Sequence, residues 1–352
     1  MIEWIAVFLA FSFMILIHEL GHFLTALKVG AKVDIFSIGM GPKLFSITRN
    51  NVEYRLSAVP LGGYVKIAGE DPSEPKTGEK WEFSSQSVGN RFKIIFAGSA
   101  LNYILGFTLF SFVFFFGYPT LTATVGGLMD NYPAKEAGVK AQDTIIAIDN
   151  EAVDNWEDVT GKIRGKIKGP IILTVDRSGS RMKIEVKPLI KETKDILGKE
   201  VKIALVGITP SDKVAYARYG LFKSFKMGAE KITSITALTY QGLWGLITGR
   251  LPFKESVSGP VGIFNVMASA AKMGIMPLLY LTAYISALLA IFNLLPFPPL
   301  DGGIILFLLI EKIMGKPVSR KAQEAAMQTG WIILIGLMLF VTYNDIFKLV
   351  KK

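Results

Sequence analysis

Cysteine is absent from this chain of 352 residues, and histidine occurs only twice. The absence of cysteine excludes a disulfide-stabilised scaffold and any zinc site built on thiolates, and it leaves the redox compartment undetermined. Both histidines, His18 and His22, lie in an apolar stretch at residues 2–27, with Glu19 beside the first. All the imidazole of the protein is therefore concentrated at one point of a hydrophobic segment.

Charge is sparse for a chain of this length. Charged residues make up 19% of the sequence and hydrophobic residues 51%, and the mean hydropathy is +0.41. This composition favours a multi-span membrane protein with a water-facing portion. The formal net charge of +10 is typical of basic cytoplasmic loops that meet anionic headgroups. Polyanion binding is the weaker alternative, so we expect the lipid bilayer as a partner and no nucleic acid.

Four apolar runs, at residues 2–27, 94–118, 276–295 and 331–350, are long enough to cross a hydrocarbon layer of about 30 Å. The first has no basic residue before Lys28 and is longer than a signal-peptide core, so we expect a retained span. The loop after it is rich in Lys and Arg, which predicts that this loop is cytoplasmic and that both termini lie outside. Among the basic residues that it carries are Lys28, Lys32, Lys43, Arg49, Arg55, Lys66, Arg91 and Lys93.

Residues 121–210 have the composition of a water-soluble module. Short alternating runs at 144–148, 171–176 and 182–186, with a turn at 177–180, predict a small β-rich domain on the outer face. The apolar stretch at 232–247 is expected to be an interfacial helix within an amphipathic segment at 211–275. A fifth span there would place Asp301 on the opposite face from His18.

The basic loop contains a hairpin signal. Two strand-like runs, at residues 44–49 and 52–57, flank Asn50 and Asn51, a dipeptide that suits the positive φ angles of a two-residue turn. A sheet edge that accepts an extended peptide and a merely ordered loop are both open interpretations.

The sequence H-E-L-G-H at residues 18–22 has the spacing of a metal site. Residues at i and i+4 share a helix face, so both imidazoles can converge on one ion with Glu19 beside it. The alternatives are a chance match and satisfied core histidines. Ionisable groups in a span cost about 3 kcal/mol or more unless they find a partner, which favours a metal.

A catalytic zinc site typically has three protein ligands. Without cysteine or further histidine, the third must be Asp or Glu, and the strongest candidate is Asp301. It follows a proline-rich break after the third apolar run, and an apolar run begins again after it. An N-cap role for Asp301 is the alternative, and it is compatible with ligation.

H-E-L-G-H together with N-L-L-P-F-P-P-L-D-G-G at residues 293–303 resembles the site-2 protease family of intramembrane zinc metalloproteases, in particular its bacterial regulator-of-sigma-E protease type. The resemblance extends to F-S-I-G-M-G-P-K-L at 36–44, P-L-G-G-Y-V-K at 60–66 and S-G-P-V-G-I at 258–263. Residues 121–150 resemble a PDZ domain. The chain departs from the family at Ser99, where a proline is usual, and at Ala141-Gln142-Asp143, where P-G-D is usual.

The resemblance implies an α-helical multi-pass membrane protein of about four transmembrane helices, with a membrane-associated β-hairpin and one inserted PDZ-like domain. The expected parts are residues 1–120, 121–210, 211–275 and 276–352. The resemblance implies Zn²⁺ held by His18, His22 and Asp301, with Glu19 as catalytic base. It gives Asn293 a contact to the substrate, and it assigns Gly39 to Pro42 and the hairpin after them to the membrane-associated β element.

The activity implied is hydrolysis of peptide bonds within transmembrane segments of single-span proteins, such as anti-sigma factors and signal-peptide remnants, in regulated intramembrane proteolysis. We expect a monomer in the bacterial cytoplasmic (inner) membrane, with the active site toward the cytoplasm and the PDZ-like domain outside. A site-1 protease acting first on the same substrate is a further expected partner.

Two other classes of function have different sequence signatures. A catalytically inactive PDZ-bearing scaffold would be favoured by loss of Glu19 or Asp301, and both are present. A metal transporter would be favoured by further His or acidic residues in several spans, and the spans after the first offer almost none.

Overall fold

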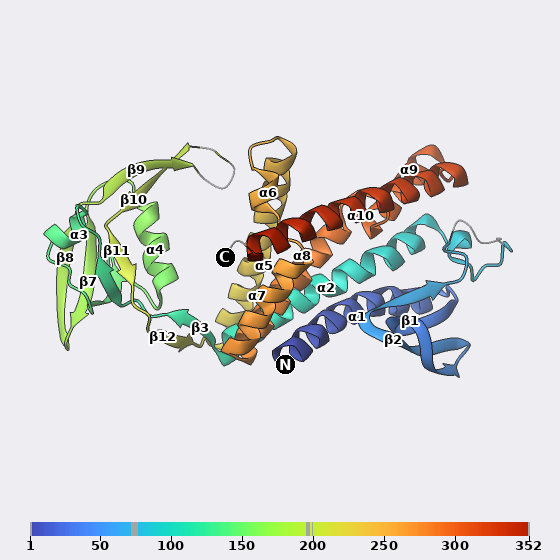
Figure 1. Cartoon of the computed structure of the whole chain (residues 1–352), viewed down its shortest axis with the longest axis horizontal. Helices are drawn as coiled ribbons and strands as arrows, with labels where there is room; N and C mark the ends of the chain where they lie inside the picture. Colours follow the sequence, from blue (N-terminus) through green and yellow to red (C-terminus); the bar gives the residue numbers. More distant parts are fainter. Residues whose placement is uncertain (1, 72–76, 195–197, 199, 351–352) are drawn as a thin grey trace. The chain divides into compact units, whose positions relative to one another are not determined.

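Four helices in the computed structural model are long and apolar enough to cross a membrane, and they correspond to the four predicted runs. The structure describes residues 2–71, 77–194, 198 and 200–350. One boundary differs, because the last helix begins at Arg320 rather than near residue 331, with polar first turns ahead of the apolar run. The four helices are α1 (Ile2–Val29), α2 (Val88–Phe116), α8 (Ile275–Asn293) and α10 (Arg320–Val350) (Figure 1).

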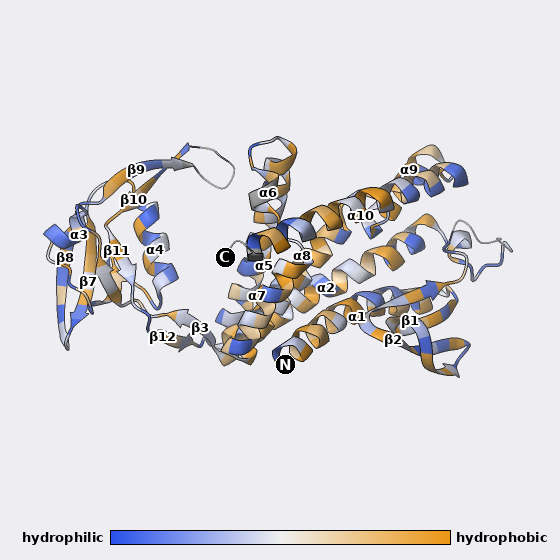
Figure 2. Cartoon of the chain, in the orientation of Figure 1, coloured by the Kyte–Doolittle hydropathy of each residue, from blue (hydrophilic) through white to orange (hydrophobic). Residues whose placement is uncertain are grey.

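The chain forms two compact units, which are described separately. The membrane unit consists of Met1–Phe112, Phe222–Tyr240 and Phe253–Lys352, and the β-rich unit of Val113–Leu221 and Gln241–Pro252. Figure 2 shows hydrophobic residues along the long helices of the membrane unit and a mixture of hydrophilic and hydrophobic residues in the β-rich unit. The difference agrees with a helical membrane protein that carries a water-facing module.

Shorter helices complete the membrane unit: α6 (Phe253–Ser256), α7 (Pro260–Met273) and α9 (Asp301–Met314). Helix α5 (Leu221–Ile247) packs on α2, where the Tyr103 and Thr236 hydroxyl oxygens lie 2.9 Å apart. It is not among the four candidate spans, as expected for residues 232–247. In α10, the Asp345 carboxylate accepts the N–H groups of Gly259 and Gly262 at 3.1 and 2.7 Å, which attaches α10 to the start of α7.

A β-sheet packs beside α1. Strands β1 (Val33–Arg49) and β2 (Val52–Ile67) join at Asn50 and Asn51, whose φ angles are 50° and 61°, as a tight two-residue turn requires. Both strands fold back on themselves, so that Phe36 lies opposite Tyr54 on one side and Val65 on the other. The first part of β1 is therefore central, and the last part of β2, from Gly63 to Ile67, forms an edge.

The β-rich unit is built on a four-stranded sheet in the order β6-β5-β7-β8. The predicted strands are present as β5 (Thr144–Ile148), β7 (Ile171–Arg177) and β8 (Ser180–Val186). The remaining elements are β3 (Tyr118–Leu121), β4 (Val125–Leu128), α3 (Pro133–Glu136), β6 (Glu151–Ala152), α4 (Trp156–Gly165), β9 (Leu189–Lys194), β10 (Glu200–Leu205), β11 (Ile208–Pro210) and β12 (Val214–Ala217). Strands β3 and β12 form a two-stranded antiparallel sheet, in which Leu121 lies opposite Val214.

The departure from P-G-D is accommodated without losing the turn. Gln142 adopts a φ of 71°, in the left-handed region that a glycine would favour. The next residue, Asp143, is buried, and its carboxylate accepts hydrogen bonds from the Arg177 guanidinium and the Lys140 N–H. The PDZ likeness of the unit stays a prediction.

Candidate metal centre

Helix α1 carries His18, Glu19 and His22 to the point where it crosses α2. The close crossing depends on Gly21, because a Cβ there would lie 2.4 Å from the carbonyl oxygen of Ala97. Small residues permit this kind of backbone approach between membrane helices. Gly98 faces the two imidazoles, and a Cβ on it would lie 2.3 Å from His22 Nε2 and 2.9 Å from His18 Cε1.

Asp301 joins the two histidines from the start of α9. It is the first residue of that helix, and Leu300 is the N-cap, so the N-cap alternative for Asp301 is wrong. The two glycines after it allow α9 to start against the preceding loop: a Cβ on Gly302 would lie 2.2 Å from the carbonyl oxygen of Leu295. A Cβ on Gly303 would lie 2.5 Å from the backbone nitrogen of Pro298. The D-G-G sequence thus positions a carboxylate at the depth of the histidines.

The three donor atoms converge on one point. The Nε2 atoms of His18 and His22 are 3.1 Å apart, and they lie 3.3 and 3.6 Å from Oδ2 of Asp301. In a tetrahedral zinc site with bonds of about 2.0–2.1 Å, neighbouring ligand atoms are about 3.3 Å apart. No other group of three such residues meets the same condition in the described part of the chain. The donor set therefore fits zinc.

Two hydrogen bonds orient these donors. His22 Nδ1–H donates to the carbonyl oxygen of Ile94 at 2.9 Å, which leaves Nε2 unprotonated toward the centre. The Ser99 hydroxyl donates to Oδ2 of Asp301 at 3.4 Å. Partners of this kind fix the orientation of ligand side chains in metal sites. Ser99, where the family usually has proline, thus contacts the third donor directly.

Glu19 lies on the side of the centre next to the sheet. Its Oε2 atom accepts the backbone N–H of Val65 at 3.1 Å, so its carboxylate is held at the edge of β2. Asn293, the last residue of α8, lies with Nδ2 3.5 Å from His18 Nε2. The structure thus brings all five residues that were predicted from the sequence into one region.

Gly98 and Val65 were not identified from the sequence. A run of small residues within an apolar span indicates close helix packing, and A-G-S-A at residues 97–100 is such a run. Val65 left no signal, because it acts through its backbone N–H.

Comparison with known proteins identifies the family of this chain. A model of peptidase family M50 matches residues 6–337. The chain belongs to peptidase family M50, the site-2 protease family. A Campylobacter jejuni protein named as a proposed zinc metalloprotease is 34% identical over 100% of this chain and 95% of its own length. Proteins named in the same way match from Clostridium acetobutylicum, at 36% identity over 96% and 95%, and from Agrobacterium fabrum, at 32% over 97% and 95%.

Family M50 membership makes the chain a zinc metalloprotease of a membrane-type fold. The matched region includes every donor of the centre and the whole β-rich unit. The chain also spans nearly the full length of these relatives.

Proposed function

We propose that this M50 protease hydrolyses peptide bonds within the transmembrane segments of single-span membrane proteins. The observation that carries the proposal is the convergence of three metal donors, with Glu19 beside them, at helices long enough to span a bilayer. Anti-sigma factors and signal-peptide remnants are the substrate classes that the family resemblance implies. Such cleavage is the second step of regulated intramembrane proteolysis, after a site-1 protease has made the first cut.

His18, His22 and Asp301 hold the zinc ion in this proposal. A bound zinc ion supplies Lewis acidity toward a water molecule and a peptide carbonyl. Glu19 acts as the general base: its carboxylate takes the proton of the attacking water and later delivers it to the leaving amine. The backbone N–H of Val65 donates a hydrogen bond to the Glu19 carboxylate at 3.1 Å, and this bond keeps the carboxylate beside the three donors. Asn293 contacts the substrate carbonyl through its amide, close to His18.

The substrate helix must unwind before its peptide bonds become accessible. In lipid, each backbone group that loses its hydrogen bond costs several kilocalories per mole, so the unwound stretch needs new partners. The edge of β2 from Gly63 to Ile67 supplies N–H and C=O groups next to Glu19. We therefore place the substrate as an added strand along this edge, a known mode of peptide recognition.

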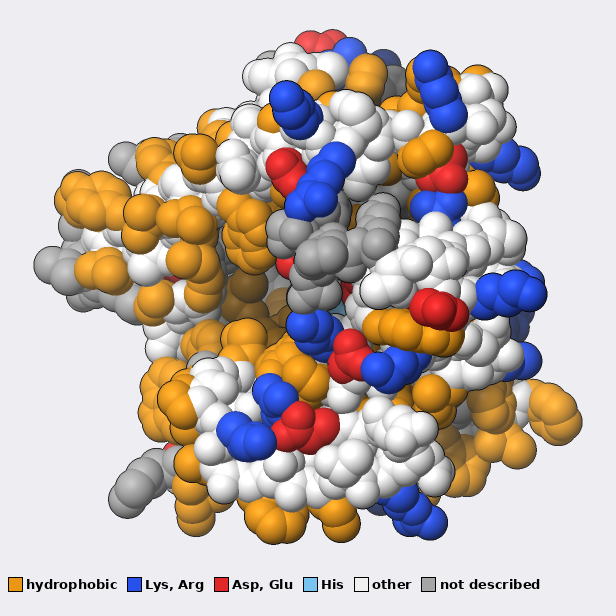
Figure 3. Space-filling model, turned by 90° about the vertical axis from the view of Figure 1, so that its right-hand side faces the viewer, with side chains coloured by type: hydrophobic (Ala, Val, Ile, Leu, Met, Phe, Trp, Pro, Cys, Tyr) orange, Lys and Arg blue, Asp and Glu red, His pale blue; other side chains and the backbone are white. Residues whose placement is uncertain are grey.

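The sidedness follows the positive-inside rule. The loop that contains β1 and β2 faces the cytoplasm of a bacterial cell, and the termini and the PDZ-like unit lie outside its cytoplasmic membrane. Figure 3 shows Lys and Arg side chains spread over the end of the membrane unit, with hydrophobic side chains around them. Many hydrophobic side chains on β1 and β2 are exposed, which supports a membrane-associated sheet; they are Ile38, Met40, Leu44, Phe45, Ile47, Leu56 and Val59.

An inactive scaffold has no support from the site. A scaffold would not need three donors at zinc spacing, nor a carboxylate held beside them by a backbone N–H. The three donors and Glu19 all come from one chain, which supports catalysis by a monomer.

The test uses the purified full chain in detergent or liposomes with a single-span substrate. Glu19→Gln keeps the size of the side chain but removes the base, so cleavage should fall by about 10²–10⁴-fold while zinc content stays the same. His22→Ala combined with Asp301→Ala should lose zinc and activity together. Glu136→Gln, an exposed change in the β-rich unit, is the matched control. Cleavage by Glu19→Gln within a few-fold of the unaltered enzyme would contradict the proposed role.

A further inference from the structure

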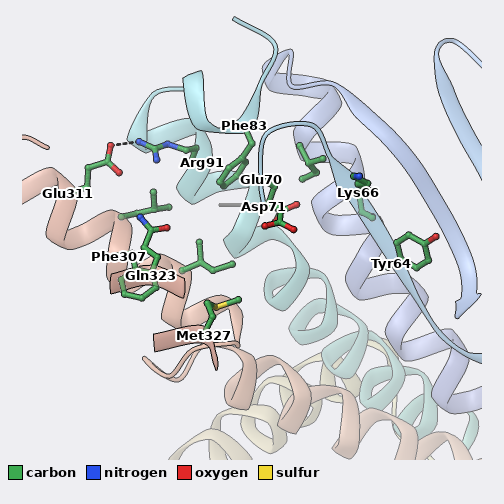
Figure 4. Close-up of a pocket in the computed structure, with 14 residues that line it drawn as sticks. Tyr64, Lys66, Glu70, Asp71, Phe83, Arg91, Phe307, Glu311, Gln323 and Met327 are labelled. Atoms are coloured by element: carbon green, nitrogen blue, oxygen red, sulfur yellow. Dashed lines mark hydrogen bonds and ion pairs between the residues drawn. The ribbon is translucent and has the colours of Figure 1, made fainter. Parts of the chain in front are cut away.

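A cavity of about 550 Å³ adjoins the edge of β2. Its walls come from the end of β2, the segment that follows β2, the start of α2, α9 and the start of α10 (Figure 4). The volume is within the range of about 300–1,000 Å³ that is usual for ligand sites. All its lining residues belong to the membrane unit.

The cavity lies next to the candidate metal centre, toward the C-terminal end of α1. The last part of β2 follows α1: the Ser12 hydroxyl donates to the carbonyl oxygen of Pro60, and the N–H of Val65 donates to Glu19. The residues of β2 that line the cavity, Tyr64 to Ile67, therefore lie beside Glu19 and toward the C-terminal end of α1. In the proposed topology, that end is cytoplasmic.

The lining combines carboxylates with apolar walls. The acidic lining residues outnumber the basic ones, and the apolar side chains include Phe83 and Met327. The acidic residues are Glu70, Asp71 and Glu311, and the basic ones are Lys66 and Arg91. The Arg91 guanidinium is already paired with the Glu311 carboxylate across one end, as Figure 4 shows. This arginine is therefore not available to the carboxylates on the opposite wall.

Among the residues that the structure describes, Glu70 is the acidic lining residue that forms no ion pair. Withdrawal from water, together with the nearby carboxylates of Asp301, Glu19 and Asp71, raises its pKa to about 8. The backbone N–H of Ile67 acts in the opposite direction and lowers the pKa. A cation brought into the cavity would be attracted to all of these carboxylates.

We propose that this cavity is a substrate subsite that binds a lysine or arginine side chain on the cytoplasmic side of the scissile bond, with Glu70 as its specificity-determining residue. The inference rests on the proposed function. The apolar walls suit the methylene stem of such a side chain, and the carboxylates suit its charged end. Single-span proteins carry an excess of Lys and Arg next to the cytoplasmic end of the span, so the group is present where the cavity lies.

The experiment measures kcat and KM in liposomes for substrates that share one span and differ at one position. A single Lys, Gln or Glu is placed in turn at each position on the cytoplasmic side of the cleaved bond. With the unaltered enzyme, Lys at one position should raise kcat/KM about tenfold or more over Gln, because a charged hydrogen bond changes binding by about this amount. The substrate with Glu at that position should have the lowest kcat/KM, and the differences between substrates should lie mainly in KM.

Variants of the enzyme then locate the effect. Glu70→Gln should reduce the preference for Lys over Gln to about threefold or less, and Asp71→Asn provides a second variant of the same wall. Glu79→Gln removes an exposed carboxylate from the same loop and should retain the preference. Loss of the preference in Glu79→Gln to the same extent would assign it to the general charge of the loop and overturn the subsite.

The two proposals fail in different ways. Equal kcat/KM for the Lys, Gln and Glu substrates at every position, with the unaltered enzyme, would overturn the subsite and leave the proposed function standing. The same holds if neither Glu70→Gln nor Asp71→Asn changes the preference. If the zinc-loaded enzyme cuts none of the substrates, the proposed function fails and the subsite fails with it.

Discussion

Replacement of Gly98 by alanine should separate metal binding from folding. The added Cβ would lie 2.3 Å from His22 Nε2 and 2.6 Å from its Cε1. To reach a separation of even 3.0 Å, the imidazole must retreat by about 0.7 Å, whereas metal–ligand distances hold to within about 0.2 Å. The donors, now 3.1–3.6 Å apart, would then no longer match a tetrahedral ion.

The expected size follows from this displacement. Changes in residues that only orient metal ligands cost about 10–100-fold in metal affinity, and Gly98→Ala displaces a ligand itself. We therefore expect at least about 100-fold weaker zinc binding, or about 2.7 kcal/mol. Alanine is also the better helix former, so α2 itself should not be weakened by the change.

The assay is a zinc titration of purified full-length protein against a competing chelator, together with thermal unfolding in the absence of metal. Gly89→Ala is the control, because it lies in the same helix and its Cβ would meet nothing within 4 Å. Gly98→Ala should lose zinc while its unfolding in the absence of metal stays close to that of Gly89→Ala. Zinc binding by Gly98→Ala within threefold of the control would refute the proposed ligand geometry.

Three further outcomes are expected. The pKa of Asp143 is lowered against its burial by the Arg177 guanidinium and the Lys140 N–H, so its contribution to stability is present above about pH 4 and is lost as the pH falls further. Asp143→Asn should therefore lower the free energy of unfolding at pH 7 by about 2 kcal/mol, seen as faster hydrogen exchange in β5 and β7, with less additional loss on acidification. Single cysteines at Lys80 and Asn150 should be labelled from the cytoplasmic and outer faces respectively, and the reverse pattern would overturn the positive-inside argument. Leu121 lies opposite Val214, so an Asn-Gly turn between them can replace residues 122–213. This enzyme should cut substrates with long outer domains. If a zinc-loaded form of it no longer cuts short substrates, the β-rich unit is instead a docking site.

Several parts of the fold could be predicted because their causes are local. A run of some twenty apolar residues must form a helix in lipid, since no other structure of a single segment satisfies its backbone groups. Two histidines four residues apart on such a helix necessarily share a face. Asn50 and Asn51 tolerate the positive φ angles of a tight turn, and they join β1 to β2 as expected.

The details of the centre depend on contacts between distant segments. Ser99 and Asp301 are 202 residues apart in the chain, yet their side chains meet, and nothing in the sequence near Ser99 indicates this. The backbone N–H of Val65 reaches Glu19 whatever the Val65 side chain is, so its role cannot be read from residue type. The cavity at Glu70 likewise exists only because β2, α2, α9 and α10 come together.

The sequence by itself therefore determined the spans, the hairpin turn and the identity of the candidate metal donors, because helix periodicity and turn conformation are properties of neighbouring residues. The tertiary structure decided how close the donors lie, which groups orient them and where the acidic cavity opens. Those features depend on how closely α1 and α2 approach at Gly21 and Gly98, and on where the start of α9 places Asp301. Such approaches follow from packing between segments far apart in the chain, which no local pattern specifies.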